Sequence, residues 1–136
     1  AATMVLVADR PDLQVLVIKR RDSSGFVAGH TLFPGGAVED DDRDPAWSTL
    51  AVGMTSREAT ATLHVPDARA FWIAAVRETI EEVGLVLGME DQSLARYRYV
   101  LESGEVTFAS LVASSGLTLD LATLLSLTAY TFCRAS

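Results

Sequence analysis

The segment from Arg77 to Leu85 constrains the fold of this chain more than any other part of its sequence, and it reads Arg-Glu-Thr-Ile-Glu-Glu-Val-Gly-Leu. In a helix with about 3.6 residues per turn, Glu78, Glu81 and Glu82 fall on one face. The opposite face is apolar and carries Trp72, Ile73, Val76, Ile80 and Val83. The segment therefore predicts a helix with one side against a core and clustered acids on the other, and Gly84 marks its end.

The clustered acids predict a metal site. Like charges at this spacing cost about 0.2–0.5 kcal/mol per pair, so a bound cation would offset their repulsion. Carboxylate oxygens gathered in this way suit Mg²⁺ or Mn²⁺. A solvated acidic face is the alternative for such a run taken alone. The neighbouring sequence therefore decides how Glu78, Glu81 and Glu82 are interpreted.

A second segment, residues 32–39, reads Leu-Phe-Pro-Gly-Gly-Ala-Val-Glu. Together the two segments resemble the signature of the Nudix hydrolases, G-x5-E-x7-R-E-U-x-E-E-x-G-U, where U is an aliphatic residue. The matching positions are Gly36, Arg77, Glu78, Glu81, Glu82, Gly84 and Leu85. Thr79 stands where the family usually has an aliphatic residue.

The spacing inside the signature is unusual. Asp42 stands where the family has its first glutamate, and 34 residues separate it from Arg77, which is 27 more than the pattern has. The sequence is similar in this respect to a subgroup of Nudix hydrolases that includes the peroxisomal coenzyme A diphosphatases of animals. We expect a helical insertion at about residues 43–69, which either shapes the substrate pocket or decorates the fold.

The resemblance implies an α/β fold in which a mixed sheet is sandwiched between helices, in a single domain over residues 1–136. It also implies a Nudix-type diphosphatase, a hydrolase acting on acid anhydrides, that uses Mg²⁺ or Mn²⁺ to cleave the diphosphate of a nucleoside diphosphate derivative. The implied catalytic residues are Arg77, Glu78, Glu81 and Glu82. The implied metal ligands are Glu78, Glu81, Glu82 and a carbonyl at Gly35. Arg77 is expected to pair with either Asp42 or Glu39 and so to fix the loop against the helix.

Further residues are expected to bind the substrate. Gly35 and Gly36 allow a close backbone approach that a β-carbon would block. Arg20 and Arg21 follow a predicted strand and either grip the diphosphate or form a solvated strand end. The insertion points to coenzyme A or an acyl-coenzyme A as substrate, while ADP-ribose and nucleotide sugars stay open. A catalytically silent nucleotide-binding module is the alternative from another class.

The rest of the chain predicts short elements. We expect strands at 3–8 and 13–19, paired as a hairpin, and an exposed acidic turn at 40–43. We expect three helices in this region. The first covers 44–50 with Asp44 as its N-cap, the second covers 56–63, and the third begins after its N-cap Asp67 and ends before Gly84. Further elements are expected as a strand at 85–87, helical segments at 91–101, 105–114 and 117–124, and a strand at 127–132.

The composition limits the kinds of partner that this chain is expected to bind. The net charge of −7 argues against nucleic acid and anionic membranes, and no apolar run reaches about 18 residues. The single cysteine, Cys133, excludes an internal disulfide and fits a reducing, cytoplasmic location. Few strands are predicted after Leu85. We therefore expect either a truncated domain or one that a second copy completes as a homodimer.

Overall fold

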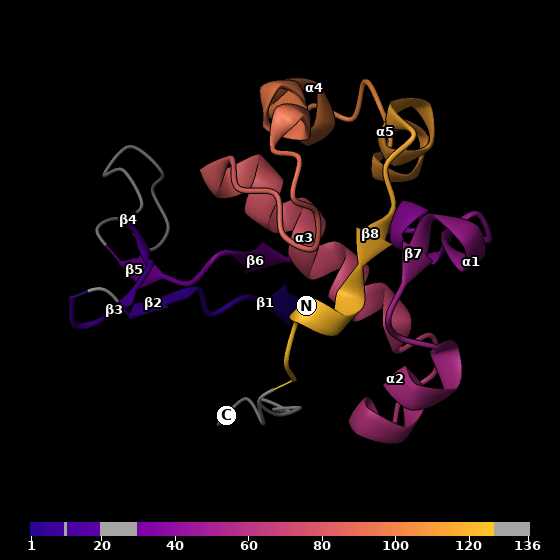
Figure 1. The fold of residues 1–136 in the computed structure, drawn as a ribbon, viewed down its shortest axis with the longest axis horizontal. Helices are drawn as coiled ribbons and strands as arrows, with labels where there is room; N and C mark the ends of the chain where they lie inside the picture. The colour runs from indigo at the N-terminus through magenta and orange to yellow at the C-terminus, as the bar shows by residue number, and fades with distance from the viewer. Residues whose placement is uncertain (10, 20–29, 127–136) are drawn as a thin grey trace, which may run out of the picture.

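The computed structural model describes residues 1–9, 11–19 and 30–126 (Figure 1). The strands are β1 (Ala2–Thr3), β2 (Val7–Asp9), β3 (Leu13–Val15), β4 (Ile18–Lys19), β5 (Thr31–Leu32), β6 (Gly35–Gly36), β7 (Ala51–Val52) and β8 (Leu119–Asp120). The α-helices are α1 (Trp47–Leu50), α2 (Ser56–Leu63), α3 (Arg69–Val83), α4 (Arg98–Glu102) and α5 (Phe108–Ser115). Three 3₁₀ turns complete the list: η1 (Asp41–Arg43), η2 (Ser93–Tyr97) and η3 (Leu121–Thr123).

The described strands form four two-stranded ladders. β1–β6, β2–β3 and β4–β5 are antiparallel, whereas β7–β8 is parallel. The predicted hairpin is confirmed as a pairing, because β2 pairs with β3 and Val7 lies opposite Val15. The strands predicted at 3–8 and 13–19 are each interrupted, because Thr3 belongs to β1, which pairs with β6, and Ile18–Lys19 form β4, which pairs with β5. The β2–β3 and β4–β5 ladders extend to one side of the helices, and β1–β6 lies beside α3 (Figure 1).

Helix α3 is the centre of the fold. It ends at Gly84, as predicted, where the backbone turns left-handed with φ +68°. Its predicted N-cap is wrong. Asp67 has φ +51°, whereas an N-cap residue needs an extended backbone, and Ala68 directly precedes the helix instead. The Asp67 carbonyl accepts a hydrogen bond from the Ala70 amide, so Asp67 belongs to the turn before the helix.

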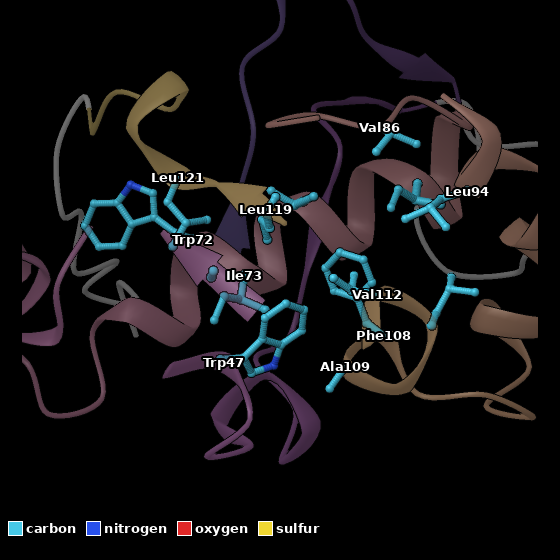
Figure 2. Close-up of a cluster of buried hydrophobic side chains, with 14 of the residues drawn as sticks. Trp47, Trp72, Ile73, Val86, Leu94, Phe108, Ala109, Val112, Leu119 and Leu121 are labelled. Carbon is cyan, nitrogen blue, oxygen red and sulfur yellow. The ribbon is translucent and has the colours of Figure 1, made fainter. Parts of the chain in front are cut away.

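The main core covers the predicted apolar face of α3 (Figure 2). Ile73, Val76 and Ile80 are fully buried, and Trp72 is nearly so. Trp47 comes from α1 and packs against Phe108 of α5, with ring centroids 5.0 Å apart. Val83 at the helix end is half-buried. The orientation that the sequence predicted for this helix is therefore confirmed.

Small residues on another side of α3 allow the Gly35–Gly36 segment, called here the glycine loop, to lie close to the helix. Ala74 and Ala75 pack directly against Ala2 of β1, with Met4 and Val38 at the edge of the same cluster. Larger side chains here would push the β1–β6 ladder away from the helix. The alanines therefore set how near the Gly35–Gly36 strand lies to the acidic face.

The insertion is folded into the core. Its buried residues are Trp47, Ala51, Ala59 and Ala68, and all of them belong to the main core cluster. Helix α2 is confirmed at 56–63 and begins with a capping box between Thr55 and Glu58. The first insertion helix begins at Trp47 rather than at residue 44, and the Asp44 carboxylate accepts a hydrogen bond from the Ala46 amide just before it.

Of the elements predicted after α3, one is wrong and one is only partly confirmed. Residues 85–87 form no strand, because the Gln92 side-chain amide binds both the N–H and the carbonyl of Val86. The helical segment predicted at 117–124 is confirmed only at η3, because β7 of the insertion pairs with Leu119–Asp120, which form β8. Helical structure at 91–101 and 105–114 is confirmed with later starts, at Ser93 and at Phe108. The predicted strand at 127–132 and Cys133 lie outside the described residues.

No helix within the described residues is long and apolar enough to cross a membrane.

Candidate active site

The glycine loop and the acidic face of α3 form one site. The Gly35 amide donates a hydrogen bond to Glu82 Oε2 at 2.8 Å. At Gly36 a β-carbon would fall 2.3 Å from Glu78 Oε1, so any other residue would displace that carboxylate from its present position. At Gly35 a β-carbon would lie 2.3 Å from the Ala2 carbonyl oxygen. The close approach that the sequence predicted for both glycines is therefore confirmed.

Arg77 connects this site to the segment before the insertion. Its Nε and Nη2 donate to the two carboxylate oxygens of Asp42, each at 3.0 Å, and both side chains are buried. Nη2 also donates to the Ala37 carbonyl at 2.8 Å. Glu39, the alternative partner, lies 3.9 Å away and is exposed. Asp42 is therefore the carboxylate that holds Arg77, and Glu39 is peripheral.

The expectation of an exposed acidic turn at 40–43 is wrong for two residues, since Asp41 is half-buried and Asp42 is buried. Asp42 is 1% exposed, because η1 turns its side chain inward toward Arg77 and the Glu39 amide. A buried charge persists where it is paired and its remaining lone pairs are satisfied. Here Arg77 supplies two donors and the Glu39 amide supplies a third at 2.8 Å.

The third nitrogen of the same guanidinium reaches the acidic face. Nη1 of Arg77 donates to Glu78 Oε1 at 3.0 Å and to both oxygens of Glu81 at 3.2 Å. The side chains of Glu78 and Glu81 are each 12% exposed. Burial would lower the pKa of Arg77, but Asp42, Glu81 and Glu78 raise it above its ordinary value. Arg77 is therefore a permanent cation between the loop and the helix.

The acidic face has more negative charge than Arg77 neutralises. Burial raises the pKa of Glu78, and repulsion from Glu82 and Glu39 raises it further, while Arg77 partly counteracts both. Burial likewise raises the pKa of Glu81, together with repulsion from Glu78 and Glu39. A further cation at this face would stabilise the ionised form of both carboxylates.

The donor set suits a hard divalent cation in its chemistry, since it consists of glutamate oxygens on one helical face. As the side chains stand, no three acidic, histidine or cysteine groups in the described ranges are arranged to hold a metal ion. Glu78 and Glu81 face Arg77, and Glu82 faces the Gly35 amide. A metal bound by the predicted ligands would thus require their side chains to turn from these partners.

Several residues were not anticipated from the sequence, or not in their full role. Thr79 is fully buried in place of the usual aliphatic residue, and its hydroxyl donates to the Ala75 carbonyl at 2.7 Å, which satisfies it inside the helix. Arg98 binds backbone carbonyls at the end of α3, a contact that no sequence pattern signals. Arg20 and Arg21, predicted to bind the diphosphate, lie outside the described residues.

A depression of about 440 Å³ lies on the insertion, away from the acids. It is lined by residues of α1, β7 and α2 and by Arg69 at the start of α3. Arg69 Nη2 donates to the Ala51 carbonyl at 2.8 Å and also to that of Trp47. The guanidinium therefore holds the turn between α1 and β7.

Comparison with known proteins gave matches among both curated sequences and solved structures. The chain is 28% identical over 120 aligned residues to the acyl-coenzyme A diphosphatase NUDT19 of Gallus gallus, covering 64% of this chain and 32% of that protein. It is 30% identical over 97 residues to the NUDT19 of Xenopus laevis, covering 56% of this chain and 26% of that protein. The chain therefore spans about a third or less of these relatives.

A crystal structure of a NUDIX hydrolase from Alicyclobacillus acidocaldarius matches 88% of this chain and 55% of its own, with a TM-score of 0.58 and 25% identity. No family model matches the sequence. The structural match extends beyond the signature segments to most of the chain.

Proposed function

We propose that this chain is a metal-dependent diphosphatase that cleaves a nucleoside diphosphate derivative. It has the α/β fold of the Nudix hydrolases and resembles their acyl-coenzyme A diphosphatases. One observation carries the proposal. The two signature segments, 47 residues apart at Gly35 and Glu82, meet in space with the glycines directly against the carboxylates.

The chain's own groups would divide the work at this site. Glu81 and Glu82 would hold Mg²⁺ or Mn²⁺, with Glu78 as a further ligand or as a base and a loop carbonyl at Gly35 as a ligand. Arg77 would keep the loop and helix together through Asp42. When bound, such a cation neutralises phosphate charge and lowers the pKa of bound water. Gly36, Arg20 and Arg21 are the proposed contacts of the diphosphate.

The proposed substrate is coenzyme A or an acyl-coenzyme A. Two observations support it: the relatives from Gallus gallus and Xenopus laevis are acyl-coenzyme A diphosphatases, and the chain has 27 extra residues inside its signature. No structural observation favours ADP-ribose or a nucleotide sugar. The predicted cytoplasmic location and homodimer stay predictions.

A substrate screen tests the proposal. The chain is incubated with coenzyme A, an acyl-coenzyme A, ADP-ribose and a nucleotide sugar, with Mg²⁺, with Mn²⁺ and with EDTA, and products are identified by mass spectrometry. We expect metal-dependent formation of a nucleoside phosphate from the coenzyme A compounds and much less from the others. Binding of these compounds without any product would instead identify a silent binding module.

A further inference from the structure

Helix α3 ends in the same turn that carries two of its acids. The last carbonyls of a helix have no donor within the helix and need one from elsewhere. Arg98 provides it, because its Nε donates to the Glu81 carbonyl at 2.6 Å and its Nη2 donates to the Glu82 carbonyl. One side chain thus binds the backbone of two of the proposed ligands.

We propose that Arg98 is a positioning residue that fixes the backbone of Glu81 and Glu82 for metal binding. This inference rests on the proposed function, since it assigns a role at the same site. Within the described residues, Arg98 makes no hydrogen bond or ion pair with the carboxylates themselves, so it would act through the main chain rather than as a ligand.

The surroundings of Arg98 make it a rigid support. It is the first residue of α4, which packs against the C-terminal part of α3 (Figure 1). Its guanidinium lies 5.5 Å from the centre of the Tyr99 ring, and its side chain passes beside Gly84. Two hydrogen bonds from one planar group fix both position and direction, which a single bond would not.

Its charge also acts on this helix end. A cation near a helix C-terminus interacts favourably with the partial negative charge of the free carbonyls. Without Arg98 those carbonyls would turn toward water and the last turn would fray, since Gly84 directly after it has wide conformational freedom. Fraying would move the Cα atoms of Glu81 and Glu82 relative to Glu78, which lies one turn deeper.

The test compares Mn²⁺ affinity, measured by electron paramagnetic resonance, in the unsubstituted chain and in Arg98→Ala, Arg98→Lys and Arg96→Ala. Arg96 is the matched control because it lies beside Tyr97 in the same way, 5.0 Å from the ring centre, but is exposed. We expect Arg98→Ala to weaken Mn²⁺ binding about tenfold, in the range known for supports of metal ligands. Lysine can restore one of the two bonds, so Arg98→Lys should fall between, and Arg96→Ala should bind normally.

Amide hydrogen exchange of residues 82–84 in EDTA accompanies the titration and reports fraying without metal. Faster exchange together with weaker Mn²⁺ binding supports the positioning role. An Arg98→Ala chain that stays folded and binds Mn²⁺ as tightly as the parent overturns it. If Arg98→Ala does not fold, normal Mn²⁺ affinity of Arg98→Lys overturns it equally. A parent chain that binds no Mn²⁺ overturns the proposed function itself.

Discussion

Arg77 and Asp42, which are 35 residues apart in the sequence, form a buried, bidentate ion pair with both nitrogen–oxygen distances at 3.0 Å. Replacing Asp42 with asparagine leaves the guanidinium buried and without its main counter-charge. We expect a loss of about 3–5 kcal/mol in the free energy of unfolding. Urea denaturation measures it, with Asp40→Asn as control because Asp40 is exposed two residues away. A loss below that of the control would show that Arg77 finds another partner.

The metal-ligand assignment predicts a catalytic effect without unfolding. Glu81→Gln and Glu82→Gln each remove a negative oxygen from the acidic face and keep the side-chain shape. We expect turnover of the preferred diphosphate to fall by orders of magnitude, while the thermal melting curve stays cooperative. Glu102→Gln, at an exposed acid of α4, should be unaffected. Near-normal metal-dependent turnover in both ligand variants would refute the site.

The apolar face of α3 predicts the opposite outcome. Ile80 has no exposed surface, so Ile80→Asp places an unpaired charge in the core. We expect loss of cooperative folding rather than a pure catalytic defect. Leu125→Asp is the matched control, since Leu125 is 87% exposed. Circular dichroism and solubility separate the two variants, and a soluble, cooperative Ile80→Asp protein would mean that the helix face is wrongly assigned.

The raised pKa values of Glu78 and Glu81 predict a pH dependence of the metal-free chain. The folded state holds these protons more tightly than the unfolded state, whose carboxyls titrate near 4.5. The stability that these groups contribute is therefore present below about pH 4.5 and is lost as the pH rises through their raised values. Chemical denaturation in EDTA across this range measures the slope. The Glu78→Gln, Glu81→Gln double variant should flatten it, and an unchanged slope would assign the dependence to other groups.

The predicted homodimer can be tested directly. Val7, Leu13 and Val15 of the β2–β3 ladder are 56%, 70% and 44% exposed, and apolar side chains gathered on a strand pair favour association. We expect light scattering at low micromolar concentration to give twice the chain mass, and Leu13→Lys to shift the equilibrium toward monomer. A parent chain that stays monomeric at all accessible concentrations would contradict this prediction.

The longest helix and the overall fold were predictable from the sequence. The 3.6-residue pattern of α3 gave its two faces and Gly84 its end, and the fold predicted from the signature is confirmed. The pattern does not reveal pairing between distant short segments. β8 is a strand because Ala51 and Val52 pair with Leu119 and Asp120, and nothing in residues 117–124 indicates that partner.

Some residues of the candidate site were predictable from the sequence and others were not. The acids and glycines follow from the signature, but the choice between Asp42 and Glu39 depended on which carboxylate is buried. Arg98 could not be anticipated, because its contacts are with backbone carbonyls, which every residue has. The prediction of Asp67 as N-cap was wrong because the backbone of Asp67 is left-handed, just before the helix begins.

The β7–β8 ladder makes the insertion and the segment after α5 depend on each other for stability. The 27 additional residues supply one of its two strands, while the segment after α5 supplies the other together with the buried Leu119 and Leu121. Cutting the insertion back to the ordinary spacing would strip the neighbour from β8 and open the core at Trp47 and Phe108. Removing either piece alone would therefore destabilise the fold, whether or not the insertion touches substrate.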